Sequence, residues 1–207
     1  MNTRLQVEHP VTELVTGLDL VRLQIEIAAG AGLPFHQDEI AWRGAAIECR
    51  IYAEDPANNF FPSPGRIMQL SAPAGPGVRV DSGIYPGWTV PLDYDPMLAK
   101  LIVWADTREH GVERMLRALD EYHVGGIKTN IPLFRLILND PGFRRGELHT
   151  GYLDELLKNV QWDTAPPAEL ARIAALIASR QSAGDTARPT MGTSSRWLAQ
   201  GREDMLR

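Results

Sequence analysis

Four polar residues stand at alternate positions in the opening segment MNTRLQVEHPVTE: Asn2, Arg4, Gln6 and Glu8. In an extended strand alternate side chains share one face, so two amides, a guanidinium and a carboxylate would project together. Leu5 and Val7 would point the other way. Such a face is typical of the solvated side of a half-buried strand, and it is also compatible with a polar binding site. The alternation alone leaves both interpretations open.

A second alternation begins after Gly44 and predicts a strand with one apolar and one charged face. The apolar face holds Ile47, Cys49, Ile51 and Ala53, and the charged face holds Glu48, Arg50, Tyr52 and Glu54. Because Cys49 lies on the apolar side, we expect a buried, unreactive thiol. An arginine on a charged strand face ordinarily pairs with a nearby carboxylate on another strand, which is the plain interpretation of Arg50.

Composition and charge argue against several classes of protein. The 207 residues carry a net charge of −5 with a pI near 5.5. No cluster of Lys and Arg is present to bind a phosphate backbone, so we expect no nucleic-acid partner. One cysteine allows no internal disulfide, which suits a reducing cytosol. Charges near the N-terminus and the lack of an apolar run of about 18 residues predict a cytoplasmic protein with no membrane partner.

Hydrophobic periodicity predicts helices on both sides of a strand-rich middle. Residues 11–29 are expected to form one helix, or two short ones broken at Gly17, with Gly30 as the stop signal. The segment 55–65 is rich in turn residues, and Thr107 is a predicted helix N-cap. The other expected elements are strands at 66–70, 77–81 and 97–104 and helices at 131–138 and 152–157. Successive strands without helices between them indicate an antiparallel sheet, so the fold class is α+β.

The composition changes after residue 158. Residues 166–179 begin with prolines and predict an accessory helix, and residues 182–195 are small and polar, as in a flexible linker. We therefore expect three parts: a terminal piece at 1–30, a domain at 31–158, and an accessory helix with a flexible tail at 159–207.

Several long motifs in order resemble biotin carboxylase. They are the opening segment, ECRIYAEDP at 48–56, FPSPGRI at 61–67, GIKTNIPLF, and TGYLDELL near residue 157. Biotin carboxylase is the ATP-dependent ligase component of acetyl-, propionyl- and methylcrotonyl-CoA carboxylases and of pyruvate carboxylase. The resemblance implies that residues 1–30 are the terminal piece of an ATP-grasp portion, followed by the biotin carboxylase C-terminal domain. It also implies a truncated enzyme that begins at an internal methionine and stops before a biotinyl domain.

The resemblance assigns the bicarbonate side of the reaction to the opening segment. In the family, bicarbonate and ATP form carboxyphosphate, and CO2 then passes to biotin. Glu8 matches the general base that takes the bicarbonate proton, and Arg4 matches the residue that holds the anion. Gln6 and the backbone of Val7 complete that pocket. Asn2 matches an oxygen ligand of Mg²⁺ or Mn²⁺.

Other residues are assigned to biotin. Arg50 matches the cation that stabilises the enolate-like oxygen of biotin, as in an oxyanion hole. Asp95 in DYDPMLAK lies near the biotin site by resemblance, and a turn role before Pro96 is equally compatible with the sequence. His9 belongs to a matched segment, where it either supports Glu8 or serves the turn before Pro10.

The implied cofactors are ATP with its metal ion, held largely outside this chain, and biotin on a carrier protein. The implied partners are that biotin carboxyl carrier, a second copy in a homodimer and a carboxyltransferase subunit. An alternative is a non-catalytic dimerisation or assembly module, because the same domain makes the homodimer contact in the family. A third possibility, the end of another ATP-grasp ligase, is disfavoured by ECRIYAEDP and FPSPG. The acyl-CoA acted on is not encoded in these motifs.

Overall fold

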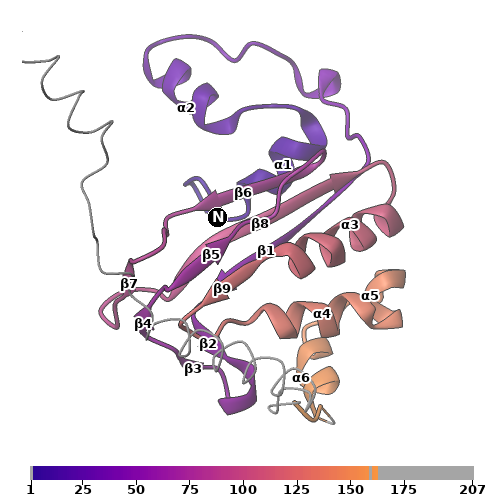
Figure 1. Cartoon of the computed structure of the whole chain (residues 1–207). Coiled ribbons are helices and arrows are strands. Elements are labelled where there is room, and N and C mark those ends of the chain that lie inside the picture. Colours follow the sequence, from indigo (N-terminus) through magenta and orange to yellow (C-terminus); the bar gives the residue numbers. More distant parts are fainter. Residues whose placement is uncertain (1, 159, 163–207) are drawn as a thin grey trace, which may run out of the picture. The chain divides into compact units, whose positions relative to one another are not determined.

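A computed structural model describes residues 2–158 and 160–162, which lie within one compact unit spanning residues 1–162 (Figure 1). The predicted accessory helix at 166–179 and the predicted linker at 182–195 lie outside the described residues. The proposed division of the chain at residues 30 and 158 stays a prediction.

The centre of the fold is a three-stranded antiparallel sheet in the order β1-β8-β6. It consists of β1 (Ala45–Tyr52), β8 (Met97–Ala105) and β6 (Val78–Ser82). The register places Arg50 opposite Lys100, and Lys100 opposite Asp81. Side chains directly opposite on one face are neighbours, so charges from three distant segments meet in one row. The α+β class and the antiparallel pairing are confirmed.

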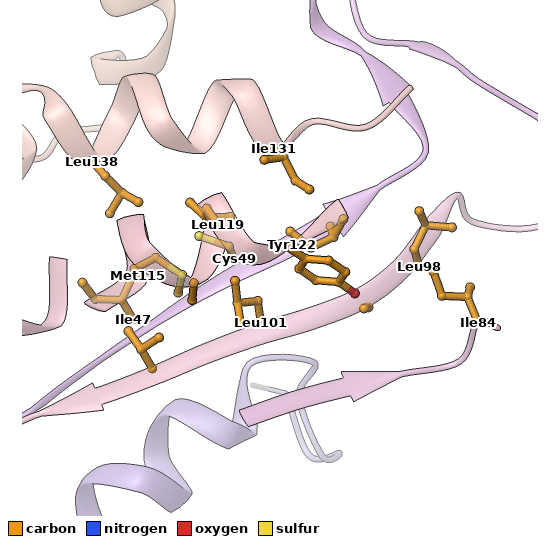
Figure 2. Close-up of a cluster of buried hydrophobic side chains, with 14 of the residues drawn as sticks. Ile47, Cys49, Ile84, Leu98, Leu101, Met115, Leu119, Tyr122, Ile131 and Leu138 are labelled. Carbon is orange, nitrogen blue, oxygen red and sulfur yellow. The ribbon is translucent and has the colours of Figure 1, made fainter. Parts of the chain in front are cut away.

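The apolar face of this sheet packs against α3 (Arg108–Glu121), as Figure 2 shows. Thr107 caps the helix by accepting a hydrogen bond from the His110 backbone N–H at 3.2 Å, as predicted. Most of the fully buried side chains come from β1, β8, α3 and α4, and they include Ile51, Leu101, Val112, Met115, Leu119 and Leu138. Burial of apolar surface is the main force that holds these layers together.

Short antiparallel pairs extend the fold beyond the main sheet. They are β2 (Glu54–Asp55) with β3 (Phe61–Pro62), β4 (Gly65–Arg66) with β7 (Thr89–Val90), and β5 (Gln69–Ser71) with β9 (His123–Gly125). The sequence predicted one strand at 66–70, and the structure instead divides it between β4 and β5. Strands β7 and β9 were not predicted, because two or three residues are too few for alternation to show.

The helices that follow α3 largely match expectation. They are α4 (Ile131–Asn139), α5 (Pro141–Arg145) and α6 (Tyr152–Leu157). The five-residue α5 was not predicted, since one turn has no periodicity. Two 3₁₀ turns, at Gln37–Glu39 and Pro56–Asn58, complete the regular structure of the described residues.

The N-terminal region differs from the predicted strand. Residues 2–8 are irregular and enter α1 (His9–Thr16) through a turn in which the His9 N–H donates to the Gln6 carbonyl at 3.2 Å. Pro10 suits the first turn of this helix, so the chain bends where a strand would need to continue. Gly17 at φ 76° ends α1 in the left-handed region, and α2 (Leu20–Ala28) follows, as the two-helix alternative predicted.

Helix α1 lies on the charged face of the sheet, on the side opposite α3 (Figure 1). It contacts β1 and β8, and it carries the irregular segment 2–8 over the same face. The charged face is therefore partly covered by protein, and its cations and carboxylates can contact the N-terminal segment. This arrangement positions the candidate site.

Candidate functional site

The two motif segments singled out from the sequence meet in an ion pair. Arg50 Nη2 lies 2.7 Å from Glu8 Oε2, although the two residues are separated by 42 positions in the chain. The pair is half-exposed, with 38% of the Arg50 side chain and 50% of the Glu8 side chain accessible. Arg50 thus pairs with a carboxylate, as its plain interpretation predicted, but not across strands, because Glu8 lies in no strand. The partner is the candidate base itself.

A second carboxylate also contacts Arg50. Arg50 Nε lies 3.4 Å from Glu48 Oε1, on the same face of β1. The Glu48 side chain is only 6% exposed, and its Oε2 has no hydrogen-bond partner among the described residues. Burial raises the pKa of Glu48, partly offset by the hydrogen bond and charge of Arg50. Burial would lower the pKa of Arg50, but Glu48 and Glu8 raise it overall, so the guanidinium stays charged.

A cavity of about 360 Å³ lies beside this ion pair. Its polar lining includes all four alternating residues of the opening segment, Asn2, Arg4, Gln6 and Glu8. Its apolar lining comes mainly from α2 and the loop after it and includes Leu20, Leu23, Ile27, Leu33 and Phe35. The four polar residues are thus brought together around one cavity even though residues 2–8 do not form a strand.

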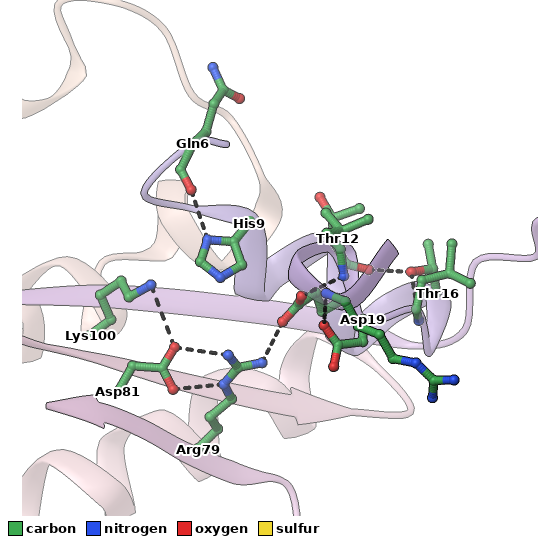
Figure 3. Close-up of polar contacts among 12 residues, drawn as sticks. Gln6, His9, Thr12, Thr16, Asp19, Arg79, Asp81 and Lys100 are labelled. Carbon is green, nitrogen blue, oxygen red and sulfur yellow. Dashed lines mark hydrogen bonds and ion pairs between the residues drawn. The ribbon is translucent and has the colours of Figure 1, made fainter. Parts of the chain in front are cut away.

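Backbone carbonyls of the opening segment are held by side chains behind it, and Figure 3 shows the contact between His9 and Gln6. His9 Nδ1 lies 2.8 Å from the Gln6 carbonyl oxygen, which requires the proton to be on Nδ1. The ammonium of Lys100 donates to the Val7 carbonyl at 3.2 Å. His9 therefore serves the turn, which is one of the two roles open to it from the sequence. Lys100 was not singled out from the sequence, because its contact joins residues 93 positions apart.

Asp95 occupies the turn before β8. Its Oδ1 accepts a hydrogen bond from the Met97 backbone N–H at 2.9 Å, which is the turn role expected for an Asp before Pro96. It does not line the cavity beside Arg4 and Glu8. Its charge is near Glu54, whose pKa is raised by burial and secondarily by Asp95.

A cavity of about 500 Å³ lies on the other side of Arg50. Its polar lining comes from β1 and the residues next to it, and its apolar lining comes largely from α4. The lining residues include Glu48, Arg50, Tyr52, Glu54, Leu133 and Phe134. Arg50 therefore lies between two cavities, since its ion-pair partner Glu8 lines the first one and Arg50 lines the second.

Asn130 is a further positioning residue that the sequence did not reveal. It is 4% exposed and lies at the free edge of β1. Its Oδ1 accepts from the Tyr52 N–H at 2.9 Å, and its Nδ2 donates to the Arg50 carbonyl at 3.0 Å. An amide can pair with an exposed strand edge in this way because it is both donor and acceptor. The only sequence signal is its place in the matched GIKTNIPLF motif.

Replacing Asn130 with alanine is expected to destabilise the fold and loosen the backbone at Arg50. The change leaves a donor and an acceptor of β1 unpaired, at a cost of about 1–3 kcal/mol for each unsatisfied buried group. Urea unfolding of Asn130→Ala measures the loss. Asn139→Ala, at the exposed other end of α4, is the matched control and should cost much less. Equal effects of the two substitutions would contradict this role of Asn130.

Three further kinds of functional feature were considered: a reactive cysteine, a metal site and a membrane-spanning helix. Cys49 is 3% exposed, and burial raises the pKa of its thiol, as expected of an unreactive cysteine. Within the described residues, no group of three or more His, Cys, Asp or Glu side chains could hold a metal ion. None of the helices in that part of the chain has the length and apolar character needed to cross a bilayer.

Two protein families match separate parts of the chain. Residues 48–155 match the family described as biotin carboxylase C-terminal domain. Residues 1–36 match the ATP-binding domain of the carbamoyl-phosphate synthase L chain. Arg50 lies in the first match and Glu8 in the second, so their ion pair joins the two families' segments.

Similar proteins are biotin carboxylases and components of carboxylases. The chain is 55% identical to biotin carboxylase of Haemophilus influenzae over 157 residues, which is 76% of this chain and 35% of that protein. It is 50% identical to the small subunit of 2-oxoglutarate carboxylase from Hydrogenobacter thermophilus over 155 residues, which is 75% of this chain and 33% of that protein. The chain thus spans about a third of the length of these relatives.

A solved structure of a similar protein has the same fold as the matched part of this chain. The biotin carboxylase domain dimer of Hydrogenobacter thermophilus 2-oxoglutarate carboxylase, in complex with MgADP, ADP and bicarbonate, matches with a TM-score of 0.74 at 47% identity. The match covers 77% of this chain and 36% of that one. The fold, the matched family and the relatives lead to one conclusion, namely that the chain belongs to the biotin carboxylase C-terminal domain family.

Proposed function

We propose that this chain supplies the bicarbonate and biotin side of a biotin carboxylase, an ATP-dependent ligase that carboxylates the biotin of a carrier protein within an acyl-CoA or related carboxylase. The observation that carries the proposal is the 2.7 Å ion pair between Arg50 and Glu8. It joins the candidate base from one motif to the candidate oxyanion-stabilising residue from another.

Glu8 acts as the general base for bicarbonate. A base must reach the proton it takes, and Glu8 lines the 360 Å³ cavity together with Arg4 and Gln6. Arg4 is exposed, and its planar guanidinium can hold two oxygens of the anion at once. The bicarbonate proton passes to the Glu8 carboxylate. The carbonate dianion that results is stabilised by the positive charge of Arg4 beside it.

Arg50 stabilises the negative charge that develops on the ureido oxygen of biotin when its nitrogen becomes nucleophilic. A fixed cation at the position of the developing charge is the arrangement that lowers such a barrier most. Arg50 lines the second cavity, of about 500 Å³, whose apolar wall from α4 suits the hydrocarbon part of biotin. Asp95 would affect the biotin site only by shaping the turn before β8.

ATP and its metal ion need more ligands than the described residues offer. Mg²⁺ takes oxygen ligands, often one or two carboxylates together with phosphates. In the described part of the chain Asn2 contributes one amide oxygen beside Glu8, and no larger acidic group is assembled there. We propose that Asn2 is an auxiliary Mg²⁺ or Mn²⁺ ligand and that most of the ATP site lies outside this chain.

The proposed partners are a biotin carboxyl carrier, a second copy of the chain and a carboxyltransferase subunit. The homologous domain of the Hydrogenobacter thermophilus protein is a dimer. Strand β6 forms one edge of the three-stranded sheet, and an unpaired edge favours association. We propose a cytoplasmic homodimer. The alternative function, a non-catalytic assembly module, would keep this association and lack the chemistry.

The test compares the chain alone with the chain in an enzyme context. The purified 207-residue protein should release no phosphate from ATP in a bicarbonate-dependent way, because positioning and neutralising the phosphates supply most of the catalysis. A chimera in which residues 2–157 replace the matching third of Haemophilus influenzae biotin carboxylase should carboxylate free biotin.

Two results would contradict the proposal. An inactive but folded chimera would favour the assembly module, and sedimentation of the 207-residue chain would then be the remaining readout of its association. Bicarbonate-dependent turnover by the isolated chain, lost in Glu8→Gln, would instead mean that the 207-residue chain is by itself a sufficient enzyme.

A further inference from the structure

A continuous series of ion pairs crosses the covered face of the sheet (Figure 3). Lys100 Nζ lies 3.5 Å from Asp81 Oδ2, directly across β8 and β6. Arg79 holds the same carboxylate through Nε and Nη2, at 2.8 and 2.9 Å. Arg79 Nη1 then donates to Glu13 Oε2 at 2.7 Å. The series joins β8, β6 and α1 through two cations and two carboxylates, so its charges balance.

The two end members of the series are shielded from water. The side chains of Lys100 and Glu13 are 13% and 9% exposed. Both oxygens of Glu13 are used, because Oε1 also accepts the Leu20 backbone N–H at 2.8 Å, at the start of α2. Burial would raise the pKa of Asp81, but Arg79 and Lys100 lower it overall, so the carboxylate remains ionised at neutral pH. Ion pairs that are half-buried and fully bonded resist rearrangement better than exposed pairs.

The series ends on the segment that carries the candidate base. Lys100 Nζ donates to the Val7 carbonyl at 3.2 Å, between Gln6 and Glu8. Residues 2–8 belong to no strand, so no hydrogen-bonded ladder holds them on the sheet. Apart from the backbone bonds of the turn into α1, their position depends on side-chain contacts. Among the described residues, the Lys100 bond is the one such contact that a largely buried charge makes.

We propose that Lys100 is a positioning residue, which holds the Val7 carbonyl and thereby keeps segment 2–8 against the sheet. Asp81 keeps the Lys100 ammonium in place, and the rest of the series anchors the Asp81 carboxylate. Nothing in this role requires Lys100 to touch a substrate. The inference rests on the proposed function, because the segment it positions is the one assigned to bicarbonate.

The test uses amide hydrogen exchange in the 207-residue chain, without any activity measurement. Within residues 5–12, the hydrogen-bonded amides, such as those of His9 and Val11, should exchange about 10- to 100-fold faster in Lys100→Met, the range expected for loss of a hydrogen bond to a charged group. Exchange in β8 and α3 should be unchanged. The control is Lys128→Met, which removes the same charge from an exposed position and should leave residues 5–12 protected. If Lys100→Met does not fold, Asp81→Asn, which removes the partner of the ammonium, takes its place.

A spectroscopic readout separates positioning from general destabilisation. The Arg50 Nη–H signals in a nitrogen-labelled sample report the ion pair that Nη2 makes with Glu8, and Glu8→Gln defines their shift when the pair is lost. Lys100→Met should move the signals toward that value, and Lys100→Arg, which keeps a cation near the Val7 carbonyl, should restore them. Unchanged exchange at 5–12, or a rise in the core equal to that at 5–12, would overturn the proposal. If the chimera were inactive but Lys100→Met still produced the expected changes in exchange and in the Arg50 signals, the proposed function would be contradicted and the positioning role of Lys100 would stand.

Discussion

Replacing Arg50 with alanine in the active chimera is expected to lower carboxylation of biotin by about 10²- to 10³-fold, while bicarbonate-dependent release of phosphate from ATP continues. The reason is that Arg50 is assigned to the charge on biotin, which develops only in the second half of the reaction. Glu8→Gln should lower both activities together, because without the base the bicarbonate does not react. Parallel assays of phosphate and of carboxybiotin measure the separation.

Two further variants make the Arg50 result specific. Arg50→Lys keeps the charge and loses the planar fork, so partial carboxylation should return. Arg66→Ala removes an exposed arginine from β4 and should leave both assays near the parent values. The assignment of Arg50 to biotin would be wrong if Arg50→Ala reduced phosphate release as strongly as carboxylation. In that case the dominant role of Arg50 would be to hold Glu8, 2.7 Å away.

Leu101→Ala is expected to destabilise the chain by about 2–5 kcal/mol. Leu101 is 0% exposed on the central strand β8, where α3 covers its face of the sheet (Figure 2). The substitution removes buried methyl groups and leaves a cavity in a region with strands on both sides. The midpoint and slope of urea unfolding, monitored by circular dichroism, give the free-energy change.

The control for Leu101 is the same substitution at an exposed leucine. Leu92 is 70% exposed in the loop after β7, and Leu92→Ala should change the free energy of unfolding by no more than about 0.5 kcal/mol. A small effect of Leu101→Ala would mean that the β8 and α3 layers are not the stabilising core. That would also undermine the site, because Lys100 extends from the same strand to the Val7 carbonyl.

Periodic patterns in the sequence predicted most of the long elements correctly. The alternation after Gly44 predicted β1 with its buried Cys49, and Thr107 was recognised as the N-cap of α3. The αL glycine at 17 separates α1 from α2, which was one of the two alternatives that the sequence left open. These features depend on residues within a few positions of each other, so local sequence contains enough information to predict them.

Long-range packing decided the rest. The alternation of residues 2–8 predicted a strand, but a strand needs a hydrogen-bonding partner, and the turn into α1 carries the segment away from one. Strands β7 and β9 exist only because β4 and β5 are there to pair with them. Very short elements take their structure from such contacts and have no periodicity of their own.

For the candidate site too, some features could be predicted from the sequence and others only from the tertiary structure. The motifs around Glu8, Arg4 and Arg50 led, through the family resemblance, to the prediction of a base, an anion-binding group and a charge-stabilising cation, and these roles stay predictions. Only the tertiary structure brought Glu8 to Arg50, and only it revealed Lys100 behind the Val7 carbonyl. These contacts join residues 42 and 93 positions apart. Sequence therefore determined which chemical groups are present, and the packing of α1 on the charged face of the sheet determined which of them meet.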